Sequence, residues 1–204
     1  MKKILLLSLL YTITILTIAN GADLKPMPEK KLMPDVFYIF KDVGSRENHG
    51  IPSGFMGSWK SIKWNSNWRE NPKEGISCVK ITYDISKDTE TSWAGVYVQS
   101  TSNNWATSKF GWDLSPYKKF TFWARGSGYV EKFGIGGITG ATELGDSGEA
   151  FIGPIDLTPE WVKYTIDLKD IDLTHIIGLF YWATPAEYNS KNVEIYLDNL
   201  AYEK

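Results

Sequence analysis

The sequence is poor in the residues that most often build disulfides, metal sites and catalytic triads. Its 204 residues include one cysteine, Cys78, and two histidines, His49 and His175. A single cysteine excludes an intramolecular disulfide, and two histidines leave almost no material for a Ser-His-Asp triad or a histidine-ligated zinc site. We therefore expect Cys78 to be an inert buried residue of a strand. Both histidines are expected in turns or on the surface.

An excess of charge of one sign is also missing. The 22 basic and 24 acidic residues give a formal net charge of -2. Nucleic acids and anionic membrane surfaces are bound through concentrated positive charge, so neither is expected as a partner. This balance favours a neutral partner.

Only one long apolar run occurs, and it lies at the start. Lys2 and Lys3 precede the apolar residues 4–19, and small residues follow at 19–21. This pattern predicts a secretory signal peptide over residues 1–21, hence a protein that is extracellular, on the cell surface or periplasmic. A membrane anchor is the alternative, but the run is shorter than the ~20 residues that a span needs. We expect no membrane span in the mature chain.

The remaining chain reads as a leader and one domain. Residues 22–35 contain three prolines and mixed charge without periodicity, which predicts a flexible leader. Residues 36–204 are long enough for one domain with a sizeable core and too short for two. We expect a monomer.

The domain is strand-like throughout. Short runs rich in β-branched and aromatic residues are separated by Gly, Pro, Asn and Asp, and no long helical stripe competes with them. Strands are predicted at residues 36–40, 78–84, 93–99, 119–125, 130–138, 161–168, 175–183 and 193–203. The fold class is therefore all-β, a sandwich of two antiparallel sheets such as a jelly roll.

Two strands predict particular side-chain directions. In the last strand the alternation changes phase at Asp198-Asn199, which predicts a β-bulge that could aim the Asp198 carboxylate. In the strand at 119–125, alternation places Phe120 and Phe122 inward, so Trp123 and Arg125 point outward. An outer face with Trp and Arg is unusual unless something covers it.

Catalytic patterns are weak. A glycosidase needs two carboxylates about 5 to 10 Å apart. The closest candidate is the segment 143–149, whose acids stand in a loop broken by glycines and do not share one strand face. A glycoside hydrolase or polysaccharide lyase using Glu131, Glu143 or Glu149 remains the alternative from the enzyme class.

Two segments, 56–72 and 92–114, combine tryptophan with polar residues such as Asn and Ser; the first is expected to be a loop, and the second to be the strand at 93–99 followed by a loop. An aromatic ring packs against the C–H face of a sugar, while amides and Arg can bond its hydroxyls. Core packing is the alternative for each single tryptophan. Together with the outward-facing strand residues, the candidate glycan contacts are Trp64, Trp68, Tyr97, Gln99, Trp105, Trp112, Trp123 and Arg125.

Several motifs add a resemblance that covers nearly the whole mature chain. They are NHGIPSGFMG at 48–57, WAGVYVQ at 93–99, NNW at 103–105, TFWARG at 121–126, LTPEW at 157–161 and YLDNL at 196–200. The sequence resembles secreted bacterial proteins with a carbohydrate-binding-module-like jelly roll, of the galactose-binding-domain-like superfamily. The resemblance implies non-catalytic binding of polysaccharide, in loops or on a concave sheet. It also implies a structural calcium ion held by Asp198, with Asp42 as a second ligand.

We therefore expect a secreted β-sandwich that binds a polysaccharide or oligosaccharide without catalysis. Besides the enzyme alternative, a cell-surface structural or adhesion protein that uses the same aromatic residues to bind another protein stays open.

Overall fold

The computed structural model describes residues 33–87, 91–140 and 143–204. The predicted signal peptide and most of the predicted leader lie outside these residues. Met33–Lys204 forms one compact unit. Within the described part of the chain, no helix has the length and apolar character needed to cross a membrane.

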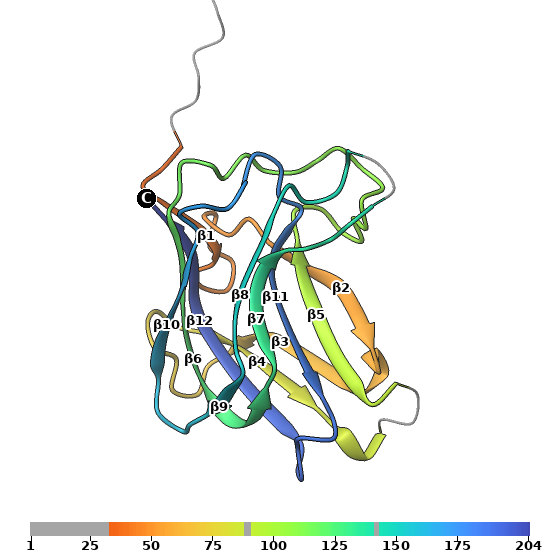
Figure 1. Cartoon of the computed structure of the whole chain (residues 1–204). Coiled ribbons are helices and arrows are strands. Elements are labelled where there is room, and N and C mark those ends of the chain that lie inside the picture. Colours follow the sequence, from red (N-terminus) through yellow and green to blue (C-terminus); the bar gives the residue numbers. More distant parts are fainter. Residues whose placement is uncertain (1–32, 88–90, 141–142) are drawn as a thin grey trace, which may run out of the picture. The chain divides into compact units, whose positions relative to one another are not determined.

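Two antiparallel sheets make up this unit (Figure 1). The seven-stranded sheet has the order β10-β6-β12-β4-β3, with β1 paired to β12 and β9 paired to β6. Its strands are β1 (Val36–Phe40), β3 (Ile62–Trp68), β4 (Cys78–Tyr83), β6 (Lys119–Val130), β9 (Ile155–Leu157), β10 (Val162–Asp167) and β12 (Val193–Glu203).

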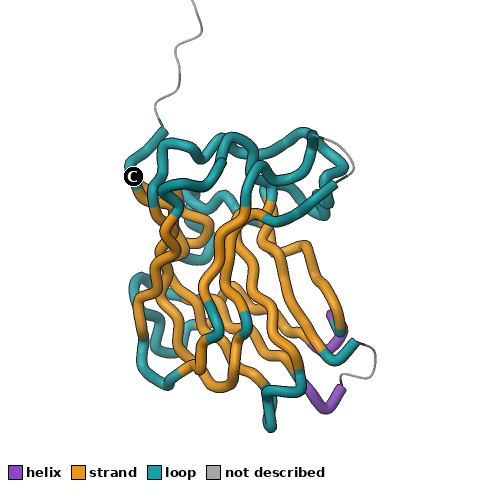
Figure 2. The backbone as a smooth tube through the Cα atoms, viewed as in Figure 1, coloured by secondary structure: helices purple, strands orange, loops and turns teal. Residues whose placement is uncertain are grey.

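The five-stranded sheet has the order β2-β5-β11-β7-β8. Its strands are β2 (Ile51–Gly57), β5 (Trp93–Gln99), β7 (Lys132–Gly136), β8 (Glu149–Ile152) and β11 (Gly178–Pro185). Two short 3-10 turns, η1 (Trp59–Ser61) and η2 (Ile85–Lys87), are the helical elements of the described residues. Figure 2 shows how strands dominate the backbone. The predicted two-sheet sandwich is confirmed.

The core lies between the sheets and is rich in phenylalanine. Phe120 and Phe122 of β6 are fully buried, as the alternation predicted. The Phe180 ring of β11 stacks on Phe120 of the other sheet, with centroids 5.7 Å apart, and on Phe133 of its own sheet, with centroids 6.1 Å apart, so stacked rings connect the two sheets. Burial of each such side chain contributes roughly 1.5–3 kcal/mol. Apolar packing therefore accounts for cohesion without a disulfide, and Cys78 is fully buried as expected.

The segment 62–68 was predicted to be a loop, and that prediction was wrong. It forms β3, in which exposed Lys63, Asn65 and Asn67 alternate with less exposed residues. A bulge between Asn65 and Trp68 then changes the register against β4. Polar composition hid a period-two pattern, because one face of this edge strand is wet.

The predicted bulge in β12 is confirmed. Its register against β6 shifts between Asp198 and Ala201, and Asn199 has φ +47°. Residues expected in the leader also reach the fold, since the Lys204 ammonium contacts the carbonyl of Met33 and the carboxylate of Asp35, both at 2.9 Å. The two ends of the described unit thus meet beside the β1–β12 pair.

Candidate functional site

The eight candidate glycan contacts do not form one surface. Trp68, Trp123 and Arg125 belong to the outer face of the seven-stranded sheet. Tyr97, Gln99 and Trp105 belong to β5 and the loop that follows it, on the five-stranded sheet. Trp64 and Trp112 pack against the core from the side. The candidate residues therefore belong to two different outer faces and to the core.

The outer face of the seven-stranded sheet is occupied by its own cations. The Lys80 ammonium lies 4.3 Å from the Trp68 ring centroid, and the Arg125 guanidinium lies 4.0 Å from the Tyr196 centroid. Cations over aromatic faces attract the ring quadrupole. The segment 69–77 adds to this cover, since the carbonyl of Glu70 accepts a 3.3 Å hydrogen bond from Arg125 Nη2. These contacts provide the cover that the sequence predicted for the face that carries Trp123 and Arg125.

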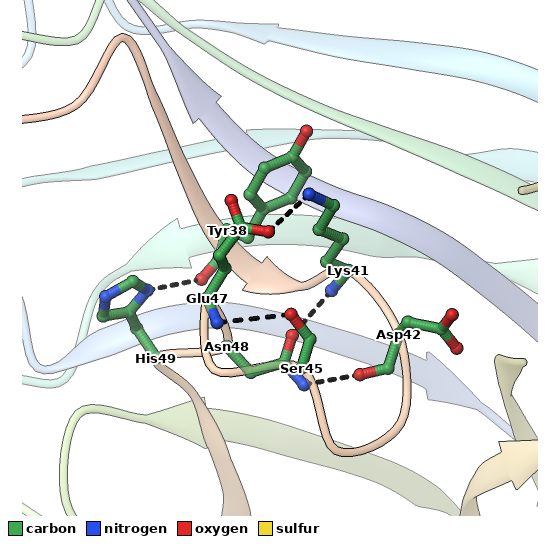
Figure 3. A network of polar contacts seen from close by, with 7 residues as sticks. All are labelled: Tyr38, Lys41, Asp42, Ser45, Glu47, Asn48 and His49. Atoms are coloured by element: carbon green, nitrogen blue, oxygen red, sulfur yellow. Dashed lines mark hydrogen bonds and ion pairs between the residues drawn. The ribbon is translucent and has the colours of Figure 1, made fainter. Parts of the chain in front are cut away.

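Asp198 and Asp42 hold the segment 69–77 in place. Asp198 Oδ2 accepts hydrogen bonds from the backbone N–H groups of Lys73 at 2.8 Å and Glu74 at 3.1 Å. Asp42 accepts from the N–H of Ile76 at 2.9 Å. Figure 3 shows the Asp42 carboxylate directed away from the Tyr38–His49 turn, in which His49 Nδ1 contacts the Tyr38 carbonyl at 2.9 Å. The two acids therefore tie this segment to β12 and to the turn after β1.

Burial and hydrogen bonding act on these two acids in opposite directions. Burial raises the pKa of Asp198 to about 6, against the effect of its backbone N–H bonds. For Asp42, burial acts to raise the pKa, but hydrogen bonds from Ser77, Ile76 and Val43 outweigh it and lower the pKa. Compared with the unfolded chain, the folded protein thus binds a proton more tightly at Asp198 and less tightly at Asp42.

These carboxylates do not fit a calcium ion as they are arranged here. Their oxygens face N–H and O–H donors, whereas calcium needs six to eight oxygen ligands. The described residues also contain no cluster of three or more His, Cys, Asp or Glu side chains able to hold a metal. These contacts argue against the calcium ion that the resemblance implies, which is untested, and chelation is its test.

The five-stranded sheet presents a different outer face. One row of residues crosses all five strands in register: Gly54, Tyr97, Tyr181, Gly134 and Phe151. The rings of Tyr97 and Tyr181 lie 4.8 Å apart. Both tyrosines are buried and cluster with Ile138 and Ile177, from the segments that close this end of the sheet. Tyr97 and Tyr181 are therefore covered by residues of the flanking loops, whereas Phe151 in the same row is exposed.

The next row along the strands consists of small and flexible residues. Met56, Gly95, Ala183 and Lys132 face one another across β2, β5, β11 and β7. Gly95 is buried and Ala183 is half-buried, and the Met56 side chain lies over Gly95, with its Cε 3.0 Å from the position of an added Cβ. We call these four residues the small-residue row.

Exposed aromatic rings border the small-residue row. Trp93 is 37% exposed and its ring packs over Gly57, where a Cβ would lie 2.9 Å from Cδ2 of the indole. Phe151 is 49% exposed, with the Lys132 ammonium 4.6 Å from its ring centroid. A ring with one face on backbone can offer the other face to a ligand. The outer face of the five-stranded sheet thus has exposed aromatic rings on either side of the small-residue row.

The loop after β5 adds Trp105 to this face. Trp105 is 40% exposed, and its ring meets Tyr97 edge-on at 5.9 Å. Gln99 is fully buried and fixes the loop, since its Nε2 donates to the Asn104 carbonyl at 2.9 Å and its Oε1 accepts from Ser53 Oγ at 2.7 Å. Trp105 is therefore placed for contact, while Gln99 positions the loop.

Trp64 and Trp112 have partners inside the protein. The Trp64 indole N–H donates to Ser66 Oγ at 2.7 Å. The Trp112 ring lies 4.9 Å from Phe37 and 5.3 Å from His49. Core and edge packing, the alternative considered for single tryptophans, describes these two positions.

The acids considered for catalysis are spread over the five-stranded sheet. Glu149 faces Gly136 at one end of β7, and Glu131 immediately precedes the other end. Five residues of strand separate these positions by about 17 Å, beyond the ~10 Å that paired glycosidase carboxylates allow. Glu143 is exposed in the loop between β7 and β8.

Sequence reasoning missed four residues of this face: Met56, Trp93, Phe151 and Tyr181. Trp93 carried a usable signal, because alternation in β5 puts it on the same face as Tyr97. Phe151 lies in the short strand β8, which the pattern did not predict.

Similarity to solved structures extends over most of the chain. The crystal structure of a family 30 carbohydrate binding module is similar with a TM-score of 0.54 and 13% identity, over 85% of this chain and 88% of that one. A family 29 carbohydrate binding module gives 0.47 and 14%, over 82% and 86%. A variant of a family 29 module complexed with cellulohexaose gives 0.47 and 14%, over 82% and 89%.

A search of curated proteins gave no match. The family model described as carbohydrate binding domain 30 matches residues 54–204, which contain every strand of the face described above except the first three residues of β2. Since this match spans well over half of the chain, the protein belongs to the carbohydrate binding domain 30 family, a family of non-catalytic carbohydrate-binding modules.

Proposed function

We propose that the protein binds a neutral, extended glycan on the outer face of the five-stranded sheet, along the small-residue row. The observation that carries this proposal is the position of Gly95 and Ala183, which lie beside the tyrosine row and between exposed Trp93 and Trp105. An extended chain of sugar rings can lie along small residues and place its C–H groups against the neighbouring aromatic rings.

The other outer face supports this site less well, because its aromatic rings are paired with Lys80 and Arg125. On the five-stranded face, Glu149 and Lys132 can accept from and donate to sugar hydroxyls. Few polar groups and a shallow surface predict modest affinity, since association must first offset the loss of translational and rotational freedom.

The test is affinity electrophoresis in gels that contain a panel of neutral polysaccharides: β-glucan, mannan and xylan. We expect wild type to be retarded by at least one of them and Trp93→Ala and Trp105→Ala to bind it about tenfold more weakly. Tyr188→Ala is the matched control, because Tyr188 is 62% exposed and lies outside this face. Equal retardation of wild type and Trp93→Ala would contradict the site.

We further propose that the whole protein has no catalytic activity, acts as a monomer, and is secreted after removal of residues 1–21. The charged start and apolar run of that segment support secretion. Cleavage is tested by N-terminal sequencing of protein recovered from the medium or periplasm. Competition of any protein partner by free oligosaccharide would separate glycan binding from adhesion to another protein.

A further inference from the structure

A pocket on the outer face of the seven-stranded sheet is left unused by the proposed site. It lies where β1, β12, β6 and β10 run side by side, and Tyr38, Trp123, Asn199 and Glu203 are among its lining residues. Ala201 faces Tyr38 on one side and Thr121 on the other. The floor is therefore again formed by small residues, with an aromatic ring at either side.

Two of the three charged residues that line this pocket, Glu203 and Lys163, are paired with each other, and the third is Glu74. Glu203 accepts a 2.6 Å hydrogen bond from Thr121 Oγ1 and forms ion pairs with Lys119 at 2.9 Å and Lys163 at 3.6 Å. Burial acts to raise the pKa of Glu203, but these partners outweigh it and lower the pKa, so the carboxylate stays ionised. The pocket thus offers carboxylate acceptors and an ammonium donor for hydroxyl groups, and its two acids disfavour an anionic ligand.

Asn199 adds a polar group without an internal partner. The β12 bulge holds it at φ +47°, and its side chain lines the pocket. Its backbone N–H donates to Asp198 Oδ1 at 2.9 Å, while its carboxamide makes no hydrogen bond to the described residues. A carboxamide can both donate to and accept from neighbouring hydroxyls of one sugar.

Trp123 is fixed in place on this surface. The Lys73 ammonium lies 4.0 Å from its ring centroid, and the segment that carries Lys73 is bound by Asp198. This contact limits the motion of the ring, and a saccharide that stacks on the ring face beneath Lys73 must displace that ammonium.

We propose that the pocket between Tyr38 and Trp123 is a second saccharide-binding site, on the face of the sandwich opposite to the first. The choice of a neutral saccharide as occupant rests on the proposed function, while the position of the site rests on the pocket itself. Two sites on opposite outer faces make the protein bivalent, so one molecule joins two glycan chains.

The test is a titration followed by two-dimensional ¹H–¹⁵N NMR of the folded chain with hexasaccharides of the β-glucan, mannan and xylan types. At least one hexasaccharide is expected to shift two separate groups of amide signals, one around Gly95 and Ala183 and the other around Asn199 and Ala201. Trp93→Ala should remove the first group of shifts, and Trp123→Ala the second.

Trp123→Ala could disturb the fold, so Asn199→Gly serves as a second variant. Glycine keeps the positive φ without strain and removes only the carboxamide. It should weaken the second site by about three- to tenfold and leave the first unchanged. Lys63→Ala, on exposed β3 and outside the pocket, is the matched control and should change neither.

The outcomes separate the two proposals. A hexasaccharide that shifts the Gly95 group but never the Asn199 group overturns the second site and leaves the first. Shifts at neither group with the whole panel overturn both. As a second readout, wild type should cross-link and thicken a solution of the polysaccharide that it binds, whereas either tryptophan variant should not; equal thickening by Trp123→Ala would contradict bivalence.

Discussion

The ring of Tyr181 lies directly over Gly134 of the neighbouring strand. A Cβ at residue 134 would come within 2.5 Å of Cε1 and Cζ of that ring. Gly134→Ala should therefore displace the ring, lower the free energy of unfolding by about 1–3 kcal/mol and weaken glycan binding. Urea unfolding and affinity electrophoresis measure the two effects.

Gly44→Ala is the control for this change. Nothing lies within 4 Å of its Cβ position, but φ is +71°, so alanine costs backbone strain far from the site. It should lower stability and leave glycan binding intact. Unchanged binding by Gly134→Ala would show that Tyr181 has no part in shaping the site.

Gln99 should affect binding only through the loop that carries Trp105. Gln99→Leu leaves the Asn104 carbonyl and the Ser53 hydroxyl without their buried partner, which costs about 1–3 kcal/mol. A loosened loop should weaken glycan binding and raise the solvent exposure of Trp105. Calorimetric titration and acrylamide quenching measure these, with Ser53→Ala as a milder control. A tightly binding Gln99→Leu protein would contradict this role.

Glu149 tests the enzyme alternative. Its Oε1 accepts a 2.6 Å hydrogen bond from the Tyr181 hydroxyl, and glutamine retains a carbonyl oxygen for that bond. Glu149→Gln should therefore keep the fold and most of the glycan affinity. Neither it nor wild type should release reducing sugar during prolonged incubation with the bound polysaccharide. Release by wild type that disappears in the variant would favour a glycosidase.

Asp198 should make stability depend on pH in an unusual direction. Its pKa in the folded state is raised from 3.8 to about 6, so the folded state binds this proton more tightly than the unfolded state. The contribution of Asp198 is most favourable below pH 3.8, falls as pH rises to about 6, and then stays constant, a total change of up to about 3 kcal/mol.

The measurement is urea unfolding of wild type and Asp198→Asn between pH 4 and 7. Asp42, with its lowered pKa, contributes stability that is lost as pH falls, so only the difference between the two proteins isolates Asp198. The free energy of unfolding of wild type, relative to that of Asp198→Asn, should fall as pH rises. A rise in this difference with pH would mean that the backbone N–H bonds outweigh burial and lower the pKa of Asp198.

Excess chelator tests the calcium hypothesis. Because Asp198 and Asp42 face N–H donors, we expect the melting temperature to be the same with EDTA as with added calcium. A ligand that binds only the folded state would raise the melting temperature in proportion to its excess over Kd. A fall on chelation would restore Asp198 as a metal ligand and require the 69–77 segment to rearrange.

Strands that are continuous runs rich in β-branched and aromatic residues could be predicted from the sequence. The predicted bounds of 36–40, 93–99 and 193–203 agree with β1, β5 and β12, because each is such a run. β2 and β8 were missed, since Pro52 and Gly54 weaken the pattern in one and the other has four residues.

The distribution of the aromatic residues over two faces could not be predicted. Trp64 and Trp68 lie four residues apart in one strand, and a bulge between them separates their environments. Tyr97 acquires its neighbours from Gly54 and Tyr181, which are distant in sequence. Composition identified residues suited to sugars, whereas register decided which of them lie together.

The pairing of β1 with β12 also determines how the fold responds to tension. Val36, at the start of β1, pairs with Glu203, at the end of β12, so the two ends of the described unit lie at the same end of this strand pair. A force that pulls these two ends apart acts on one inter-strand hydrogen bond at a time and peels the pair open like a zipper, instead of loading all of its bonds in shear. When the two ends of the described unit are pulled apart, this strand pair should therefore separate first, before the five-stranded sheet, to which neither end belongs.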